Sequence, residues 1–364
     1  MNNLRRSLAA VTALGFMLYG SSCTQEVTSQ NTVPSEDVDS LKIGLSFDSY
    51  VIERWTRDRD VFCSTANELG AEVNVQSANG EMETQISQIQ YFIDIEVDAI
   101  VIVTIDADGL TDAIRSAKEA GIPVICYDRI VRNADADLYI SFDNEAVGTY
   151  MAEAICDEIG DGGNVVEITG PVSDYNVVQV MEGFETVCEE HDENILMEYN
   201  CESWRSELAY EFVNDNIDVV SEADIIMCGN DALAGEAVHA LAERGLAGQI
   251  KVIGQDADLE ACQRIVEGTQ LMTVYKPVER LARLAAEYAV KLAEGEEIEV
   301  VGTFDDGTYD IPYVAIESVA VDQDNIDEVI IESGFHLRED VYMNTDDETE
   351  TSVPEETSET PEET

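Results

Sequence analysis

The chain has 364 residues, which is enough for two domains that each bury a hydrophobic core. Hydrophobic residues make up 45% of it and charged residues 26%, as in a soluble globular protein. The formal net charge of −58 at pH 7 repels phosphates and other anions, so it argues against a nucleic acid partner and against an anionic ligand. We attribute the acidity itself to solubility.

The N-terminal segment 1–23 has the pattern of a secretory signal. Arg5 and Arg6 form a charged start, and residues 8–19 are an apolar stretch too short to span a bilayer comfortably. The small residues directly before Cys23 resemble the bacterial lipoprotein signal, in which that Cys becomes the lipidated first residue. We therefore expect a lipid anchor at Cys23, with plain cleavage nearby as the alternative. Residues 24–40 are polar and predict a flexible tether.

Strand and helix patterns alternate over residues 41–127. The predicted strands are 41–47, 71–76, 99–105 and 124–127, and the predicted helices are 53–69, 84–95 and 110–120. Trp55, Phe62 and Ala66 fall near one face of the first helix, and Gly70 ends it. Strands that alternate with helices favour a parallel sheet with right-handed crossovers.

Residues 124–148 connect this set to a second one. The strand 124–127 is followed by Asp128 and Arg129, by a strand at 138–142, and by a helical pattern after Asp143. The two strands lack the crossover helix that a parallel neighbour usually needs, so we expect the chain to leave one sheet here and enter another. Asp143 and Asn144 are the predicted hinge positions, and we expect Asn144 to cap the helix that follows.

The alternation resumes in the second half of the chain. The predicted strands are 165–169, 195–199, 225–228, 251–254 and 271–275, and the predicted helices are 145–159, 176–189, 207–216, 233–244 and 259–267. A helix at 278–292 and strands near 300 and at 314–319 leave room for two further crossings, with Pro277 as another hinge position.

The sequence therefore predicts an α/β fold of two Rossmann-like lobes with parallel sheets, joined by a three-crossing hinge. The N-terminal lobe is expected at 41–143 plus 277–306, and the C-terminal lobe at 144–276 plus 307–340. Residues 341–364 are dominated by Glu, Asp, Thr and Ser and predict a disordered acidic tail.

Signals for catalysis, metal binding or a cofactor are weak. The seven Cys residues after Cys23 are scattered without a C-x-x-C pair, which indicates neither a disulfide framework nor a zinc site. The three His residues share no spacing with a nucleophile, and phosphate-binding and hydrolase motifs are missing from the sequence. We expect a protein that is not an enzyme and that uses no metal or cofactor.

Planar polar groups follow many of the strands. They are Arg54, Asp128, Arg129, Asp174, Asn176, Asn230, Asp256 and Lys276. Open α/β sheets bind ligands at the carboxyl ends of their strands, and Arg forks or carboxylates can span two adjacent hydroxyls. This pattern predicts an uncharged polyhydroxylated ligand. Taken singly, Asp and Asn after a strand are equally typical helix N-caps, and Asp128 with Arg129 could be a surface pair.

The two Trp residues, Trp55 and Trp204, fall in or beside these loops. The flat face of an indole suits the C–H face of a pyranose, so both are candidates for packing on a sugar. A place in the hydrophobic core is the alternative for Trp55.

Six stretches together resemble the periplasmic sugar-binding proteins of ABC importers, which have the type I fold. They are ERW with DRD at 53–60, VQSANG at 75–80, YDR at 127–129, SFDNE at 141–145, GQDAD at 254–258, and GTQ with YKP at 268–277. The resemblance covers roughly residues 41–338. Within the family it is to members that bind D-xylose.

The resemblance implies that one monosaccharide, D-xylose first, binds between two closing lobes. The eight polar residues named above would hydrogen-bond the sugar and Trp204 would stack on it. Trp55 and Tyr175 are candidate aromatic platforms, and Tyr175 departs from the family pattern. We expect Arg129→Ala to weaken sugar binding at least about tenfold with little loss of melting temperature.

The resemblance also implies partners and a location. These are an ABC permease with its ATPase, an extracytoplasmic position on the bacterial membrane through the lipid anchor alone, and a monomeric state. A sensor that presents its closed form to a chemoreceptor or histidine kinase is the alternative, as is a binder of another pentose or a hexose.

Overall fold

The computed structural model describes residues 40–298, 300 and 302–345, which belong to one compact unit of the chain. The predicted signal peptide, Cys23 and the tether up to residue 39 lie outside the described residues, as does the predicted tail from residue 346. The tail was predicted to begin at 341, but Val341 ends helix α11 (Arg338–Val341) and is buried. None of the helices in the described residues is long and apolar enough to cross a membrane.

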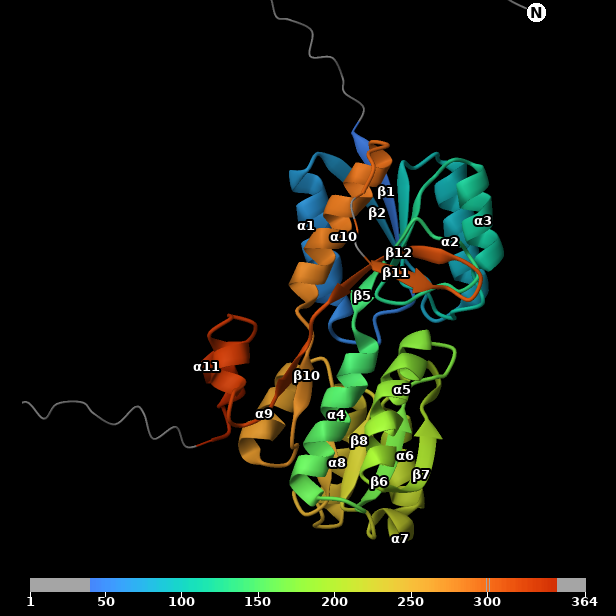
Figure 1. The fold of residues 1–364 in the computed structure, drawn as a ribbon. Helices are drawn as coiled ribbons and strands as arrows, with labels where there is room; N and C mark the ends of the chain where they lie inside the picture. The colour runs from blue at the N-terminus through green and yellow to red at the C-terminus, as the bar shows by residue number, and fades with distance from the viewer. Residues whose placement is uncertain (1–39, 299, 301, 346–364) are drawn as a thin grey trace, which may run out of the picture. The chain divides into compact units, whose positions relative to one another are not determined.

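The first lobe is built on a seven-stranded sheet with the order β11-β12-β5-β4-β3-β1-β2. Its strands are β1 (Leu41–Phe47), β2 (Ala71–Ser77), β3 (Ala99–Ile102), β4 (Val124–Tyr127), β5 (Leu138–Phe142), β11 (Gly302–Asp305) and β12 (Asp310–Ile316). The central strands are runs of apolar residues because helices cover both faces. Figure 1 shows α1 (Trp55–Glu68) and α10 (Val278–Ala293) on one face, and α2 (Met82–Asp94) and α3 (Thr111–Glu119) on the other.

The second lobe is built on a four-stranded parallel sheet with the order β7-β6-β8-β9. Its strands are β6 (Asn164–Thr169), β7 (Asn194–Asn200), β8 (Ile225–Cys228) and β9 (Lys251–Ile253). A small antiparallel pair, β10 (Thr273–Tyr275) and β13 (Val319–Val321), lies beside them. The helices are α4 (Asn144–Ile159), α5 (Tyr175–Glu190), α6 (Glu207–Asp215), α7 (Ile217–Val220), α8 (Asp231–Glu243) and α9 (Leu259–Glu267). The predicted two-lobed α/β fold is confirmed.

Three connections join the lobes. The first crossing follows Phe142, which agrees with the lobe boundary expected at residue 143. The expectation that strands without a crossover helix are not parallel neighbours was wrong, because β5 pairs in parallel with β4. A loop of residues 128–137 makes this parallel connection without a helix. The second crossing runs from β10 into α10 at Pro277, as predicted.

The third crossing lies later than predicted. We assigned residues 307–316 to the second lobe, but β12 pairs in parallel with β5 of the first sheet, from Tyr313 opposite Tyr139 to Ile316 opposite Phe142. The chain crosses between β12 and β13. The assignment was wrong because the local pattern of a strand does not say which sheet it joins.

The start of α4 lies at the first crossing. Asp143, and not Asn144, is the N-cap, and its carboxylate accepts a hydrogen bond from the amide of Ala146 at 3.1 Å. Asn144 is 1% exposed, and its Nδ2 donates to Oε1 of Gln179 in α5 at 3.3 Å. The hinge role of Asp143, Asn144 and Pro277 stays a prediction.

Helices α4 and α5 pack backbone to backbone. A Cβ atom added at Gly148 would lie 1.8 Å from the carbonyl oxygen of Val180, and one at Gly183 would lie 2.0 Å from that of Glu145. Glycine at both positions therefore allows the close distance between α4 and α5.

Candidate functional site

A cavity between the two lobes gathers the side chains that follow the strands of both sheets. The space free of protein atoms there, including the part open to solvent, amounts to about 460 Å³. All nine residues predicted to contact a ligand line it: Arg54, Asp128, Arg129, Asp174, Asn176, Trp204, Asn230, Asp256 and Lys276. They meet because the carboxyl ends of parallel strands lie at the same edge of a sheet.

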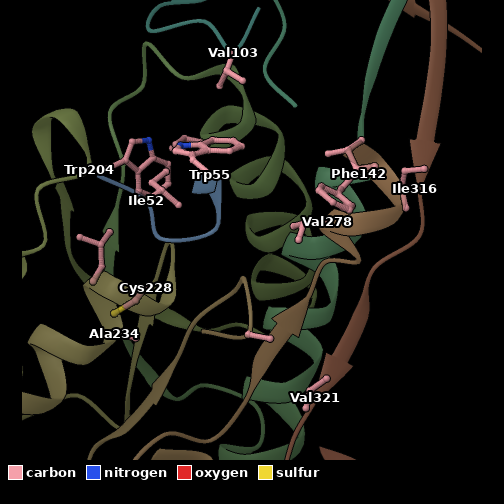
Figure 2. Close-up of a cluster of buried hydrophobic side chains, with 14 of the residues drawn as sticks. Ile52, Trp55, Val103, Phe142, Trp204, Cys228, Ala234, Val278, Ile316 and Val321 are labelled. Carbon is pink, nitrogen blue, oxygen red and sulfur yellow. The ribbon is translucent and has the colours of Figure 1, made fainter. Parts of the chain in front are cut away.

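The two predicted aromatic platforms lie in different places. Trp55 lines the cavity and is also packed into the hydrophobic core. It therefore occupies both of the positions considered from the sequence, in the core and beside the predicted ligand. Figure 2 shows it close to Ile52 and Trp204 in the buried cluster. Tyr175 lies outside the cavity, where the guanidinium carbon of Arg132 is 5.0 Å from the centre of its ring.

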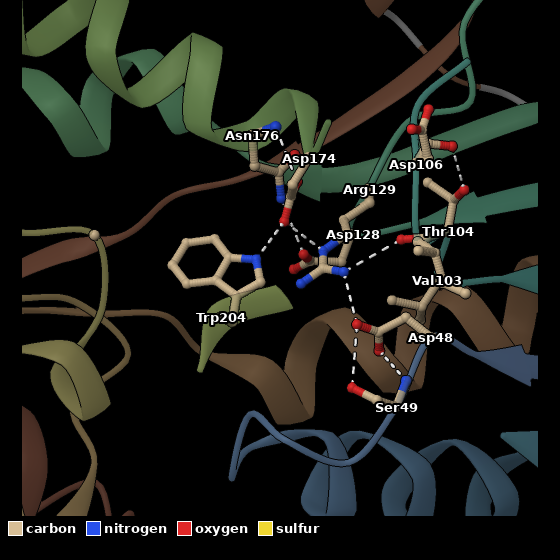
Figure 3. A network of polar contacts seen from close by, with 12 residues as sticks. Asp48, Ser49, Val103, Thr104, Asp106, Asp128, Arg129, Asp174, Asn176 and Trp204 are labelled. Atoms are coloured by element: carbon tan, nitrogen blue, oxygen red, sulfur yellow. Dashed lines mark hydrogen bonds and ion pairs between the residues drawn. The ribbon is translucent and has the colours of Figure 1, made fainter. Parts of the chain in front are cut away.

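Arg129 is held by a carboxylate from each lobe (Figure 3). Its Nε is 2.7 Å from Oδ2 of Asp174 in the second lobe, and its Nη1 is 2.8 Å from Oδ2 of Asp48 in the first. The same Nη1 donates to the carbonyl of Thr104 at 3.2 Å. Burial acts to lower the pKa of Arg129, but Asp174 and Asp48 outweigh it and hold that pKa above its ordinary value. Arg129 is therefore a permanent cation in the wall of the cavity.

Asp128 makes a second contact across the lobes. Its carboxylate pairs with Nη2 of Arg54, and its Oδ1 accepts a hydrogen bond from Nδ2 of Asn176 at 3.0 Å. Burial acts to raise the pKa of Asp128, but Arg54, Lys276 and Arg129 together hold it below its ordinary value. Asp128 is thus ionised and acts as an acceptor.

The capping and binding interpretations of the polar residues in the second lobe turn out to be compatible. Oδ1 of Asp174 accepts from the amide of Asn176 at 3.1 Å as the N-cap of α5, while its Oδ2 accepts from Nε1 of Trp204 at 3.1 Å. Oδ1 of Asn230 accepts from the amide of Leu233 at 2.9 Å as the N-cap of α8. Each residue caps a helix and also lines the cavity.

Charges around the cavity are paired. Lys276 Nζ lies 3.5 Å from Oδ1 of Asp256, which adds a fourth ion pair to the one of Arg54 and the two of Arg129. A surface in which cations and carboxylates offset each other suits a neutral ligand better than a charged one. The described residues hold no group of three or more His, Cys, Asp and Glu side chains placed to bind a metal ion.

Several buried polar atoms at the cavity have no hydrogen-bond partner among the described residues. They are Nη1 of Arg54, Nε1 of Trp55, Oε1 of Gln255 and Oδ1 of Asp256, the last of which has an ion pair with Lys276 but no hydrogen bond. Buried donors and acceptors in native proteins are nearly always paired, because an unpaired one costs about 1–3 kcal/mol. Two donors and two acceptors match hydroxyl groups, which both accept and donate hydrogen bonds.

Three site residues have a backbone conformation that side chains disfavour. The φ angle is +64° at Asp128, +56° at Trp204 and +101° at Asp256. Such angles cost on the order of 1–3 kcal/mol each and persist where the surrounding structure fixes them, as it does at ligand sites. The positions of these three side chains are therefore set before a ligand arrives.

Sequence reasoning missed part of the cavity. Gln255 lines the cavity two residues after the end of β9, so the rule that found Asp128 and Asp256 applies to it as well. Asp48 directly follows β1 and supports the site through its ion pair with Arg129. The apolar wall gave no such signal, because apolar residues there look like ordinary core. It consists of Ile52, Val177, Val180, Met181 and Met227.

A family profile described as a periplasmic binding protein domain matches residues 43–297. The chain belongs to this family. It is 40% identical over 307 residues to the D-xylose-binding periplasmic protein of Haemophilus influenzae, and the aligned region covers 83% of this chain and 92% of that protein. It is 39% identical over 301 residues to the D-xylose-binding periplasmic protein of Escherichia coli, and this aligned region covers 81% of the chain and 91% of the relative.

The fold is that of the family as well. The ABC transporter solute-binding protein from Clostridium phytofermentans, solved with bound β-D-glucose, superimposes with a TM-score of 0.74 at 26% identity. The match covers 82% of this chain and 99% of that one. The resemblance found in the sequence is confirmed.

Proposed function

We propose that this member of the periplasmic binding protein family is an extracytoplasmic protein that binds one monosaccharide, D-xylose, between its two lobes. The observation that carries the proposal is the cavity in which Arg54, Trp55 and Gln255 present unpaired polar atoms beside residues of both lobes. Two relatives about 40% identical over most of the chain are D-xylose-binding proteins, which supports the choice of sugar.

Binding couples to closure because the contacts belong to different lobes. Arg54, Trp55, Asp128 and Arg129 come from the first lobe, whereas the contacts of the second lobe come from Asp174, Asn176, Trp204, Asn230, Gln255 and Asp256. A sugar that contacts both sets gains its full hydrogen bonding in the closed arrangement alone, so it shifts the population of the protein toward that state. The three crossings are the hinge about which the lobes move.

The energetics fit a transport receptor. Micromolar affinity corresponds to about −8 kcal/mol. Charge-assisted hydrogen bonds contribute about 1.5–3 kcal/mol each, and the cavity supplies them from three cations and three carboxylates. A few such bonds reach micromolar affinity after the cost of ordering both partners.

The closed form is presented to an ABC permease with its ATPase, and the protein acts as a binder rather than an enzyme. The names of the relatives and of the solved structure support this role. The protein works as a monomer without a cofactor, and the lipid at Cys23 keeps it at the membrane.

Isothermal titration calorimetry of the purified protein tests the proposal. Xylose should give saturable heat, and ribose, arabinose, galactose and glucose should bind more weakly. Recovery of the sugar chemically unchanged after incubation separates binding from catalysis. Absence of heat with all five sugars would refute the proposed function.

A further inference from the structure

A second cavity, separate from the ion pairs of the first, lies between helix α5 and strands β6 and β7 of the second lobe. The space free of protein atoms there, including the part open to solvent, amounts to about 1050 Å³. Five glutamates contribute to its lining: Glu167, Glu182, Glu185, Glu189 and Glu198. No Lys, Arg or His lines it among the residues that the structure describes. We call this cavity the acidic groove.

Glu167 distinguishes the acidic groove from an ordinary acidic surface. It sits in the middle of β6, is 3% exposed, and its Oε1 has no hydrogen-bond partner within the described part of the chain. A buried carboxylate without a donor or counter-ion is unusual, because its burial costs several kcal/mol. The position therefore indicates a group that the protein alone does not supply.

Other carboxylates surround Glu167 from two directions. Glu198 is its partner in the parallel pairing of β6 with β7, and Glu185 approaches from α5. Burial, with the charges of Glu198 and Glu185, raises the pKa of Glu167 to about 8. A cation that entered the groove would relieve this repulsion and favour the ionised carboxylate.

The rest of the lining defines the kind of cation. Val178 and Met181 add apolar surface to the same lining as the glutamates. A hard divalent ion prefers a shell made of oxygen atoms, whereas an alkyl chain with ammonium groups at intervals matches alternating carboxylates and apolar side chains.

We propose that the acidic groove binds an aliphatic polyamine, with one ammonium group paired to Glu167 and further ammonium groups paired to the glutamates at the rim. This site goes beyond the proposed sugar binding and does not depend on it. Thr169, Val177 and Met181 line both cavities, but the charged contacts of the two are separate.

Calorimetric titration with spermidine at constant ionic strength tests the site in the full-length protein. Glu167→Gln keeps the size of the side chain and removes its charge, and should weaken spermidine binding at least about tenfold. Glu211→Gln removes the same charge from an exposed position on α6 outside the groove and should leave the affinity unchanged. Equal affinity in the two variants would overturn the proposal, because it would mark the binding as a general effect of net charge.

Proton release gives a second, independent signature. At pH 7 a carboxyl group with a pKa of about 8 is mostly protonated, so pairing with an ammonium group should release up to one proton. The heat of spermidine binding should then depend on the ionisation enthalpy of the buffer, and Glu167→Gln should abolish that dependence. Heat that is independent of the buffer in the wild-type protein would contradict the role of Glu167.

Two controls separate this proposal from misfolding and from a metal site. Xylose binding by Glu167→Gln reports an intact fold. If Glu167→Gln does not fold, Glu198→Gln at the exposed rim takes its place as the test, and it should weaken spermidine binding as well. Calcium that binds more tightly than spermidine, with the same loss in Glu167→Gln, would refute the polyamine and leave a metal site in its place.

Discussion

The guanidinium of Arg129 and the carboxylate of Asp174 lie 2.7 Å apart across the boundary between the lobes, and both side chains are buried. Because Arg129 also neutralises Asp48, its removal leaves two buried carboxylates without a counter-ion. The expectation from sequence, that Arg129→Ala would cost little stability, is therefore replaced by a different one.

We now expect Arg129→Ala to lose both sugar binding and stability. Breaking a buried ion pair costs about 3–5 kcal/mol, and sugar affinity should fall by at least about tenfold. Calorimetry with xylose and differential scanning calorimetry measure the two effects. Arg129→Lys is the matched control, since it keeps the charge but loses the fork that reaches Asp174 and Asp48 together. An unchanged melting temperature in Arg129→Ala would show that the two carboxylates do not need it.

Two variants of Asn230 can separate its role as a helix cap from its proposed role in ligand binding. Its Oδ1 caps α8, so Asn230→Ala should lose about 1 kcal/mol of stability as well as sugar affinity. Asn230→Asp keeps a capping oxygen and removes the amide donor, so it should retain the melting temperature and still bind xylose more weakly. Thermal unfolding and titration of both variants check this. Full affinity in Asn230→Asp would show that the amide group does not contact the sugar.

Tyr175 should control the lifetime of the closed state without touching the ligand. Arg132 of the first lobe packs on its ring, and next to it the amide of Ala107 donates to the carbonyl of Ser173 across the lobes at 2.9 Å. A cation–π contact contributes about 0.5–2 kcal/mol, so Tyr175→Ala should release xylose about two- to thirtyfold faster. Tyr175→Phe keeps the ring and should release it at the wild-type rate.

The rate of release is accessible because both Trp residues of the chain line the cavity. Stopped-flow Trp fluorescence during displacement of the sugar follows it directly. Equal rates for Tyr175→Ala and the wild-type protein would mean that the contact with Arg132 does not hold the lobes together.

Asp58 should make stability depend on pH. It is buried in α1, accepts a hydrogen bond from the hydroxyl of Tyr127, and lies near Arg54, Asp128 and Asp256. Burial raises its pKa from 3.8 to about 7, against the opposing effect of Arg54. Folding therefore takes up a proton in this range, so the stability that this group contributes is full below pH 3.8 and is lost as the pH rises to about 7.

Asp58→Asn tests this sign, because an amide does not ionise. The melting temperature of the variant should rise relative to that of the wild-type protein between pH 4 and pH 8. Other buried acids, such as Asp231, titrate in both proteins and cancel in the difference. A difference that stays constant over this range would show that Asp58 keeps its ordinary pKa.

The sequence predicted the elements and the site better than the connections. The polar residues at strand ends were found because parallel strands in a βα repeat place their carboxyl ends together, which spacing alone reveals. The partner of β12 was missed because pairing over more than 150 residues leaves no local pattern. Tyr175 was predicted as an aromatic platform because it lies between Asp174 and Asn176, which line the cavity, but successive residues at a helix start point in different directions.

The late position of β12 and α10 has a consequence for the order in which the protein is made. The sheet strands of the second lobe, β6 to β9, are contiguous in the chain, whereas the first lobe receives α10 and β12 after all of them. During synthesis the apolar face that α10 covers stays open until residue 293 has emerged, and β5 lacks its outer neighbour until residue 316. The N-terminal lobe therefore cannot complete its sheet before all the sheet strands of the second lobe have been made, and the second lobe in turn receives β13 and α11 after β12.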